Sequence, residues 1–217
     1  SGSRLEGSSG ISSTGALTIS GTSGSGYHGV WIAGTGTINV GGDITINGQN
    51  TPSNWGVWLE SAYNIKTSAG NISLTGSGGG GVYSYAHLLA GNSATPTSGG
   101  SITVNATSTN ANYGLEVTTS SVVAYGPISL TGTSNGEHGV IVRGAGVKVQ
   151  SASGVTINGS GSWGLTLYND SIIQSTGGNI GITATGTLGG LYLNTTGGIF
   201  ASNDATSPVT ATSNPTS

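Results

Sequence analysis

The sequence returns at nearly regular intervals to one short phrase: an aromatic residue or histidine, a glycine, and two aliphatic residues around a variable one. It reads "YHGVWIAG" at 27–34, "NWGVWLES" at 54–61, "NYGLEVTT" at 112–119, "EHGVIVRG" at 137–144 and "SWGLTLYN" at 162–169. Its glycines, Gly29, Gly56, Gly114, Gly139, Gly164 and Gly190, are separated by 27, 58, 25, 25 and 26 residues. The separation of 58 covers two periods, and we place Ser84 at the missing position. Such a period indicates a repeat architecture.

Each period contains three short segments that resemble strands. Phrases such as "ALTISG", "DITING" and "PISLTG" precede the glycine phrase, and phrases such as "TINV" and "VKVQ" follow it. These segments are too short for helices and alternate as strands do. Three strands per period predict an all-β fold, a right-handed parallel β-helix (a β-solenoid) of about seven three-strand coils. The predicted coils are 15–42, 43–70, 71–100, 101–126, 127–154, 155–178 and 179–208.

Alternation along the strands predicts which side chains are buried. Pairs such as Leu17/Ile19 and Ile44/Ile46 of the first strand, and Val57/Leu59 of the second, should form aliphatic ladders inside the solenoid. The glycine of the phrase permits a corner that a Cβ would crowd. The residues before it, or aligned with it, should stack at the inner side of that corner: His28, Trp55, Tyr83, Tyr113, His138 and Trp163.

The composition excludes several classes of partner. Only 11 residues are charged and only four are Lys or Arg, so a nucleic-acid surface or an anionic-membrane surface is not expected. Cys is absent, and no apolar run is long enough for a transmembrane helix. Residues 1–10, "SGSRLEGSSG", read as a tag remnant or linker. Residues 11–217 read as a single β-helix domain, a fragment of a longer repeat array.

The ionisable residues do not suggest catalysis. The acids, Glu6, Asp43, Glu60, Glu116, Glu137, Asp170 and Asp204, fall in different columns of the expected solenoid. A paired-carboxylate site is therefore not expected, and the chain should not be an enzyme. His28 and His138 lie four coils apart, too far to share a metal ion. We expect no cofactor and no metal.

The aromatic residues provide the candidate ligand-binding site. Trp31 and Trp58 should stack side by side on the exposed outer column of the second strand, together with Ala86, Glu116, Ile141, Thr166 and Tyr192. Exposed rings can bind sugar faces; the alternative is stacking between coils alone. Tyr83, Tyr85 and His87 form a second candidate patch. It lies beside the polar stretch 91–100, which we expect to replace the third strand of its coil.

The outer face of the first strand carries hydroxyl and amide side chains. Its residues are Thr18/Ser20, Thr45/Asn47, Ser73/Thr75, Thr103/Asn105, Ser129/Thr131 and Thr156/Asn158. Such an array resembles an ice-binding solenoid, although Thr also favours any exposed strand face.

The phrases "GGDITING", "AGNISLTGSG", "GPISLTGTSNGEHGV" and "TGGNIGITATG" resemble the repeats of filamentous-haemagglutinin-like exoproteins of two-partner secretion, and next those of autotransporter adhesins. The resemblance covers residues 15–208. It implies a secreted or cell-surface Gram-negative protein that passes an outer-membrane transporter unfolded and forms a shaft.

We therefore expect a non-catalytic shaft or adhesive segment that contacts a host-surface glycan or protein receptor. The alternatives are a polysaccharide-binding or polysaccharide-degrading β-helix, and an ice-binding solenoid. Exposed strand edges at the two ends predict end-to-end self-association.

Overall fold

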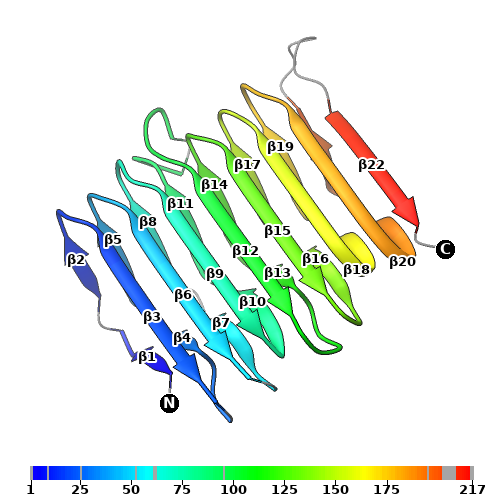
Figure 1. Cartoon of the computed structure of the whole chain (residues 1–217). Helices are drawn as coiled ribbons and strands as arrows, with labels where there is room; N and C mark the ends of the chain where they lie inside the picture. Colours follow the sequence, from blue (N-terminus) through cyan, green and yellow to red (C-terminus); the bar gives the residue numbers. More distant parts are fainter. Residues whose placement is uncertain are drawn as a thin grey trace.

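The computed structural model describes residues 2–8, 10–24, 26–51, 53–60, 63–94, 96–194, 196–201 and 209–215. Their regular structure consists of β-strands, and the strand pairs are parallel. The described residues include no helix that is long and apolar enough to cross a membrane. The predicted parallel β-helix is thus confirmed. Figure 1 shows the strands stacked side by side along one axis, with the two termini at opposite ends.

Within the described residues, seven turns repeat one three-strand pattern. The first strands are β3 (Leu17–Ser23), β6 (Ile44–Asn50), β9 (Ile72–Gly78), β12 (Ile102–Ser108) and β15 (Ile128–Ser134). The second are β4 (Val30–Ala33), β7 (Trp55–Leu59), β10 (Gly80–Ser84), β13 (Leu115–Thr118) and β16 (His138–Arg143). The third are β5 (Thr37–Val40), β8 (Asn64–Thr67), β11 (His87–Ala90), β14 (Ser121–Ala124), β17 (Lys148–Ser151), β19 (Ile172–Ser175) and β21 (Gly198–Phe200).

In the last two turns the first and second strands are continuous. They form β18 (Val155–Tyr168) and β20 (Ile180–Asn194), and β18 thereby joins the first-strand and second-strand sheets. Strands β1 (Ser3–Glu6) and β2 (Ile11–Ser13) lie before the first turn, and β22 (Val209–Pro215) follows the last. β22 pairs with β20 in register, as a first strand does.

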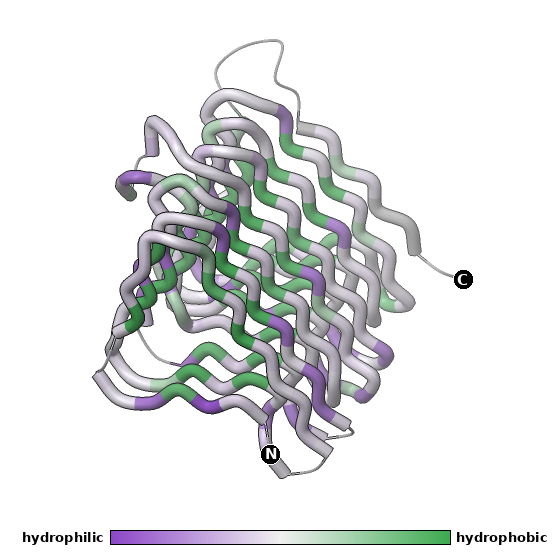
Figure 2. The backbone as a smooth tube through the Cα atoms, turned by 60° about the vertical axis from the view of Figure 1, so that its left-hand side comes forward, coloured by the Kyte–Doolittle hydropathy of each residue, from purple (hydrophilic) through white to green (hydrophobic). Residues whose placement is uncertain are grey.

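The core is built from stacked aliphatic columns, as the alternation predicts. Ile19 pairs with Ile46, and Ile46 pairs with Leu74, in successive turns. Ile46 and Leu74 are fully buried, whereas Ile19 in the first turn is half-buried. Figure 2 shows the alternation as green and white segments along the parallel rungs. Each turn thus covers the apolar side chains of the previous one, which is the main stabilising interaction of a solenoid.

Two glycine columns form the tight corner between the first and second strands. A methyl group on Gly56 would lie 2.7 Å from the Gly48 carbonyl oxygen, and one on Gly139 would lie 2.8 Å from that of Gly132. The two backbones therefore approach too closely for a Cβ, which explains the glycine of the repeated phrase. Gly48 and Gly132 belong to a matching first-strand column that the sequence reading did not identify.

The placement of Ser84 at the missing glycine position is wrong. Gly80 pairs with Trp55, Val82 with Val57 and Ser84 with Leu59, so Gly81 occupies that position. The phrase comes early in the third turn because only Gly79 separates β9 from β10.

The extra residues of the third turn come later, at 91–100. They follow the third strand, β11; the prediction that they replace this strand is wrong.

At the N-terminal end of the molecule, the solenoid begins before residue 11. Ser3–Glu6, inside the stretch interpreted as a linker, form strand β1, and Leu5 pairs with Ile32 and packs on the core.

Candidate functional site

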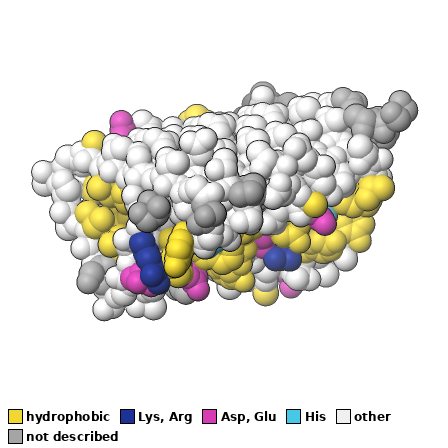
Figure 3. Space-filling model, turned by 60° about the horizontal axis from the view of Figure 1, so that its bottom comes forward, with side chains coloured by type: hydrophobic (Ala, Val, Ile, Leu, Met, Phe, Trp, Pro, Cys, Tyr) yellow, Lys and Arg dark blue, Asp and Glu magenta, His cyan; other side chains and the backbone are white. Residues whose placement is uncertain are grey.

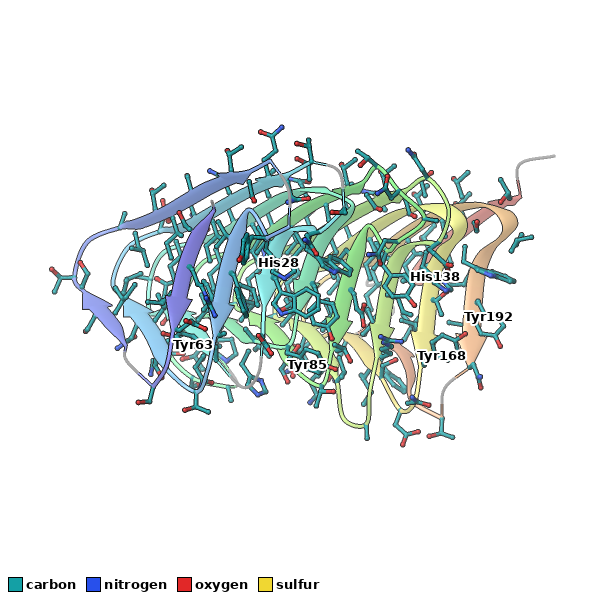
Figure 4. All side chains as sticks on the ribbon, turned by 90° about the horizontal axis from the view of Figure 1, so that it is seen from below. His28, Tyr63, Tyr85, His138, Tyr168 and Tyr192 are labelled. Carbon is teal, nitrogen blue, oxygen red and sulfur yellow. The ribbon has the colours of Figure 1, made fainter. Side chains whose placement is uncertain are left out.

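Most aromatic side chains gather on the outer side of the second-strand sheet. The sequence has four Trp and eight Tyr, and this side holds every Trp and five of the Tyr. Figure 3 shows hydrophobic side chains as a band along the long axis, with charged groups among them, and Figure 4 views the same side from below. We call this surface the ring face. It consists of His28, Trp31, Trp55, Trp58, Tyr83, Tyr85, Tyr113, His138, Trp163, Tyr168 and Tyr192.

The register of the second strands places these rings in columns. Trp31 pairs with Trp58 on the next turn, so the predicted register is right, but it is the His28 ring that stacks on Trp58 and meets Trp31 edge-on. The next member of this column is Tyr83, however, and the prediction of Ala86 is wrong because of the early start of β10. Glu116, Ile141, Thr166 and Tyr192 continue the column, as predicted.

The rings contact one another along the solenoid axis: Trp58 is stacked on His28 and Tyr83, and the other ring pairs are tilted or edge-on. Trp31 and Trp58 are half-buried, not exposed as predicted. The Trp58 ring is stacked between the rings of His28 and Tyr83, with centroid separations of 4.7 Å and 4.1 Å. The Arg4 guanidinium lies 4.0 Å from the Trp31 ring centroid. Neighbouring side chains therefore occupy both flat faces of Trp58, and these faces are not free to bind a sugar ring.

The predicted inner position of the ring column that begins with His28 is wrong. His28 and Trp55 contact the outward ring of Trp58, so their rings lie outside the core. Strict alternation would place Trp55 on the same side as Val57. The alternation is broken at Gly56, where a Cβ would point at the Ser77 backbone: Val57 is in the core, and the Trp55 ring contacts Trp58 outside it.

His28 is held as a neutral hydrogen-bond acceptor. The Trp55 backbone N–H donates to His28 Nδ1 at 3.3 Å, and Trp31 Nε1–H donates to Glu60 Oε2 at 2.9 Å. Burial lowers the pKa of His28, and the Glu60 carboxylate partly opposes this shift. Burial also lowers the pKa of His138, whose Nδ1 lies 2.7 Å from the Thr166 hydroxyl.

A buried ion pair interrupts the rings in the middle of the face. The Glu116 side chain is 1% exposed, and its Oε1 accepts from Arg143 Nε at 2.7 Å and from Nη2 at 2.5 Å. Burial raises the pKa of Glu116, and Arg143 opposes the shift. Arg143 also lies over the Tyr113 ring, 5.6 Å from its centroid. Burial, Tyr85 and the Glu116 carboxylate all raise the pKa of Tyr83.

The predicted patch of Tyr83, Tyr85 and His87 is divided between two faces. Tyr83 and Tyr85 lie together on the ring face, with ring centroids 5.0 Å apart. His87 lies on the third-strand sheet, where it lines a groove with a volume of about 560 Å³. The chain turns a corner between Tyr85 and His87, so the three residues do not form one site.

Three of the described carboxylates are hydrogen-bonded to neighbouring side chains or backbone groups. Asp43 Oδ1 accepts from the Asn71 backbone N–H at 2.7 Å, Glu60 accepts from Trp31, and Glu116 pairs with Arg143. Among the described residues, no group of three or more His, Asp or Glu could hold a metal ion. Asp204 lies outside the described residues.

The first-strand outer face is in register from turn to turn. Thr18, Thr45 and Ser73 form one column, and Ser20, Asn47 and Thr75 form the next. Asn105 and Asn158 interrupt the second column further along. The array of hydroxyl and amide groups therefore exists as expected, and ice binding stays a prediction.

Several residues of the ring face, and the Glu116–Arg143 pair that lies among them, were not identified from the sequence as site residues. Arg143 stands two positions after Ile141, which alternation places outward, so its pairing with Glu116 on the neighbouring strand could have been inferred. The positions of Tyr113 and Tyr168 on this face, and the outward direction of His28, depend on the geometry of the corners, which the repeat pattern does not give. Comparison with known proteins adds no assignment: no family model, curated protein or solved structure matches this chain.

Proposed function

We propose that this chain is a rigid, non-catalytic segment of the shaft of a Gram-negative surface adhesin. The observation that carries the proposal is the column register, which runs without interruption through the first strands from β3 to β20. Each added turn lengthens such a solenoid by about 4.8 Å and buries the apolar surface of the turn before it. This geometry suits a spacer that displays other regions at a distance from the cell.

The ring face supports a structural role in that shaft. Its rings cover one another along the axis, and its central carboxylate is neutralised by Arg143. The structural use of Asp43, Glu60 and Glu116 likewise supports a non-catalytic role.

The composition is compatible with export through an outer-membrane transporter. The chain has no Cys, so no disulfide forms before or during passage. On this proposal the turns form outside the cell, and a host glycan or protein receptor contacts the assembled adhesin.

Surface labelling tests the location. Antibodies raised against the folded chain should label intact cells of the bacterium that produces it, and protease added outside should remove the label. An antibody to a cytoplasmic protein is the control for cell integrity. Labelling that requires permeabilised cells would contradict the proposal.

A glycan array tests the role of the ring face. We expect the Trp31→Ala/Trp58→Ala variant to give the same glycan profile as the unmodified chain, because ring faces used in stacking are not available to a sugar. Tyr125→Ala, which removes a 40% exposed ring outside this face, is the matched control. A glycan signal that only the double variant loses would make the ring face a receptor site and overturn its purely structural role.

A further inference from the structure

The third-strand sheet carries an outward groove that is independent of the ring face. Its floor and walls come from four neighbouring strands, β8, β11, β14 and β17, which Figure 1 shows side by side. Ala94, from the stretch 91–100 that is inserted after β11, and Gly146 also line it. Hydrogen bonds between Asn92 and Thr97 close the insertion on itself, and the Gly91 backbone N–H at its start donates to the Thr67 carbonyl of β8 at 2.9 Å.

The groove concentrates the positive charge of a chain that carries net charge −3. Lys66 and Lys148, the only lysines in the sequence, both line it. None of its described lining residues is acidic. The ion pairs among the described residues involve Arg4, His138 and Arg143, so neither lysine has an acidic partner there. A pair of ammonium groups without counter-charges favours an anionic ligand.

The two lysines lie at opposite ends of the groove, each beside an amide side chain. Asn64 and Lys66 face outward from β8, and Lys148 and Gln150 face outward from β17. Between them, Leu89 pairs with Lys66 on one side and with Val123 on the other, and Val123 pairs with Gln150. In the adjacent column His87 pairs with Asn64, and Ser121 pairs with Lys148. The middle of the floor is thus apolar in one column and polar in the other, with a lysine at each end.

The spacing selects the form of the ligand. Lys66 and Lys148 are three strand steps apart, roughly 14 Å along the axis at about 4.8 Å per step. Lys148 pairs with Ser121, two residues from the column of Lys66, so the two Cα atoms are roughly 16 Å apart. An extended peptide advances about 3.4 Å per residue, so its residues i and i+4 are roughly 14 Å apart. Residues i, i+2 and i+4 point to the same side of an extended chain. The flexible lysine side chains can span the difference of about 2 Å, so two carboxylates at i and i+4 of a peptide that crosses the strands obliquely would reach them. An apolar side chain at i+2 would then lie beside Leu89 and Val123.

We propose that this groove binds an extended acidic peptide segment of the pattern acidic–x–apolar–x–acidic. The peptide runs obliquely across the strands β8, β11, β14 and β17, from Lys66 to Lys148. The lysines bind its two carboxylates, and Leu89 and Val123 bind its central side chain. A uronic-acid oligosaccharide offers the negative charges but no apolar side chain for the floor, so a peptide fits the groove better.

The test uses fluorescence anisotropy with the full chain and a labelled peptide, Ser-Glu-Ser-Leu-Ser-Glu-Ser, with blocked ends. We expect saturable binding that weakens with added salt. Lys66→Gln and Lys148→Gln should each weaken binding about tenfold, as for loss of a charge-assisted contact. Leu89→Ala should weaken binding because it removes the apolar contact with the central leucine of the peptide. Lys66→Arg keeps the positive charge and should retain binding.

Three controls separate the proposal from general charge attraction. Asn47→Asp changes the net charge as much as Lys66→Gln does, but on the exposed first-strand face, and should leave the affinity unchanged. A peptide with adjacent glutamates and the same composition should bind at least several-fold more weakly, and so should an oligo-uronate. Circular dichroism establishes that each variant is folded.

Equal binding of both peptides, stronger binding of the oligo-uronate, no effect of the two lysine substitutions, or no saturable binding at millimolar peptide would overturn the proposal. These outcomes leave the shaft proposal untouched, because it does not depend on this groove.

Discussion

At the scale of single residues, the shape of the solenoid depends on glycines where backbones nearly touch. Gly139 and Gly132 face each other across the corner of the fifth turn, whereas Gly181 lies on the outer side of β20 with open space beside it. The same residue type therefore has opposite importance at the two places. Gly139 and Gly181 both lack a positive φ. The difference between them therefore lies in the room available for a Cβ and not in backbone conformation.

Replacement of these glycines by alanine tests this difference. Gly139→Ala should lower the free energy of unfolding by about 3 kcal/mol, because the methyl group would overlap backbone atoms that cannot move independently. Gly181→Ala should be neutral or stabilising by about 0.5 kcal/mol, since it restricts only the unfolded chain. Urea unfolding of both variants measures the difference. Similar losses in both would show that the corner tolerates a Cβ.

The ion pair on the ring face predicts a pH-dependent defect. Arg143→Ala should cost roughly 2–3 kcal/mol at pH 7, because it leaves the Glu116 carboxylate buried without a partner. This is less than for a fully buried pair, since the Arg143 side chain is 39% exposed. The Glu116 pKa is already above its ordinary value of 4.5, and loss of Arg143 raises it further.

The sign of the pH dependence follows from proton binding. Between pH 4.5 and the raised pKa, the folded variant holds a proton that the unfolded chain has released, so its stability rises as the pH falls. The deficit relative to the unmodified chain should therefore shrink from pH 7 toward pH 4.5 in urea titrations. The double variant Glu116→Gln/Arg143→Ala is the control: it has no carboxyl group at position 116 to take up the proton, so its stability should lack this pH dependence. A deficit that is constant with pH would exclude an unpaired carboxylate as its cause.

At the scale of elements, the side chains of neighbouring strands contact one another on both sides of the sheets. β7 and β10 are joined inside by Val57 and Val82 and outside by Trp58 and Tyr83. The ring face therefore acts as a second apolar layer outside the core. This layer adds to the stability of the fold, so fewer ion pairs are needed to stabilise it.

Removal of one ring measures the contribution of this outer layer. Trp58→Ala should lower the free energy of unfolding by about 2 kcal/mol, less than a fully buried Trp because the side chain is half-buried. Tyr125→Ala, an exposed ring outside the face, should change it by less than about 0.5 kcal/mol. Chemical denaturation with both variants provides the comparison. Equal effects would mean that the stacked rings add little stability.

At the scale of the whole molecule, the ends of the solenoid differ from its middle. Leu167 is fully buried, whereas Leu193, its partner one turn later, is 53% exposed, and Phe200 is 50% exposed. Among the described residues, β22 covers only the first-strand part of the last turn, and no strand covers its second-strand and third-strand parts. Edge strands of this kind present backbone groups without a strand partner.

This end geometry predicts concentration-dependent association of the isolated chain. Sedimentation velocity should show dimers or longer species as concentration rises, and Leu193→Lys should shift the distribution to monomer by placing a charge on the terminal rung. Tyr125→Lys, the same change on a surface away from the ends, should leave it unchanged. A monomer at every concentration would contradict end-to-end pairing.

The period, the aliphatic columns and the parallel stacking were all predictable from the sequence, because strand alternation and repeat spacing are local properties. Ile19, Ile46 and Leu74 could be aligned from their phrases alone. The proximity of Trp31 and Trp58 follows from the same repeat.

Only the tertiary structure decided how the corners direct the side chains. The outward rings of His28 and Trp55, the position of Tyr83 beside Trp58, and the separation of His87 from Tyr85 depend on corner lengths that differ between turns. The lysine groove depends on side chains from strands that are about 80 residues apart in sequence being in register. Such contacts are set by how the turns lie over one another, and no single period of the sequence contains that information.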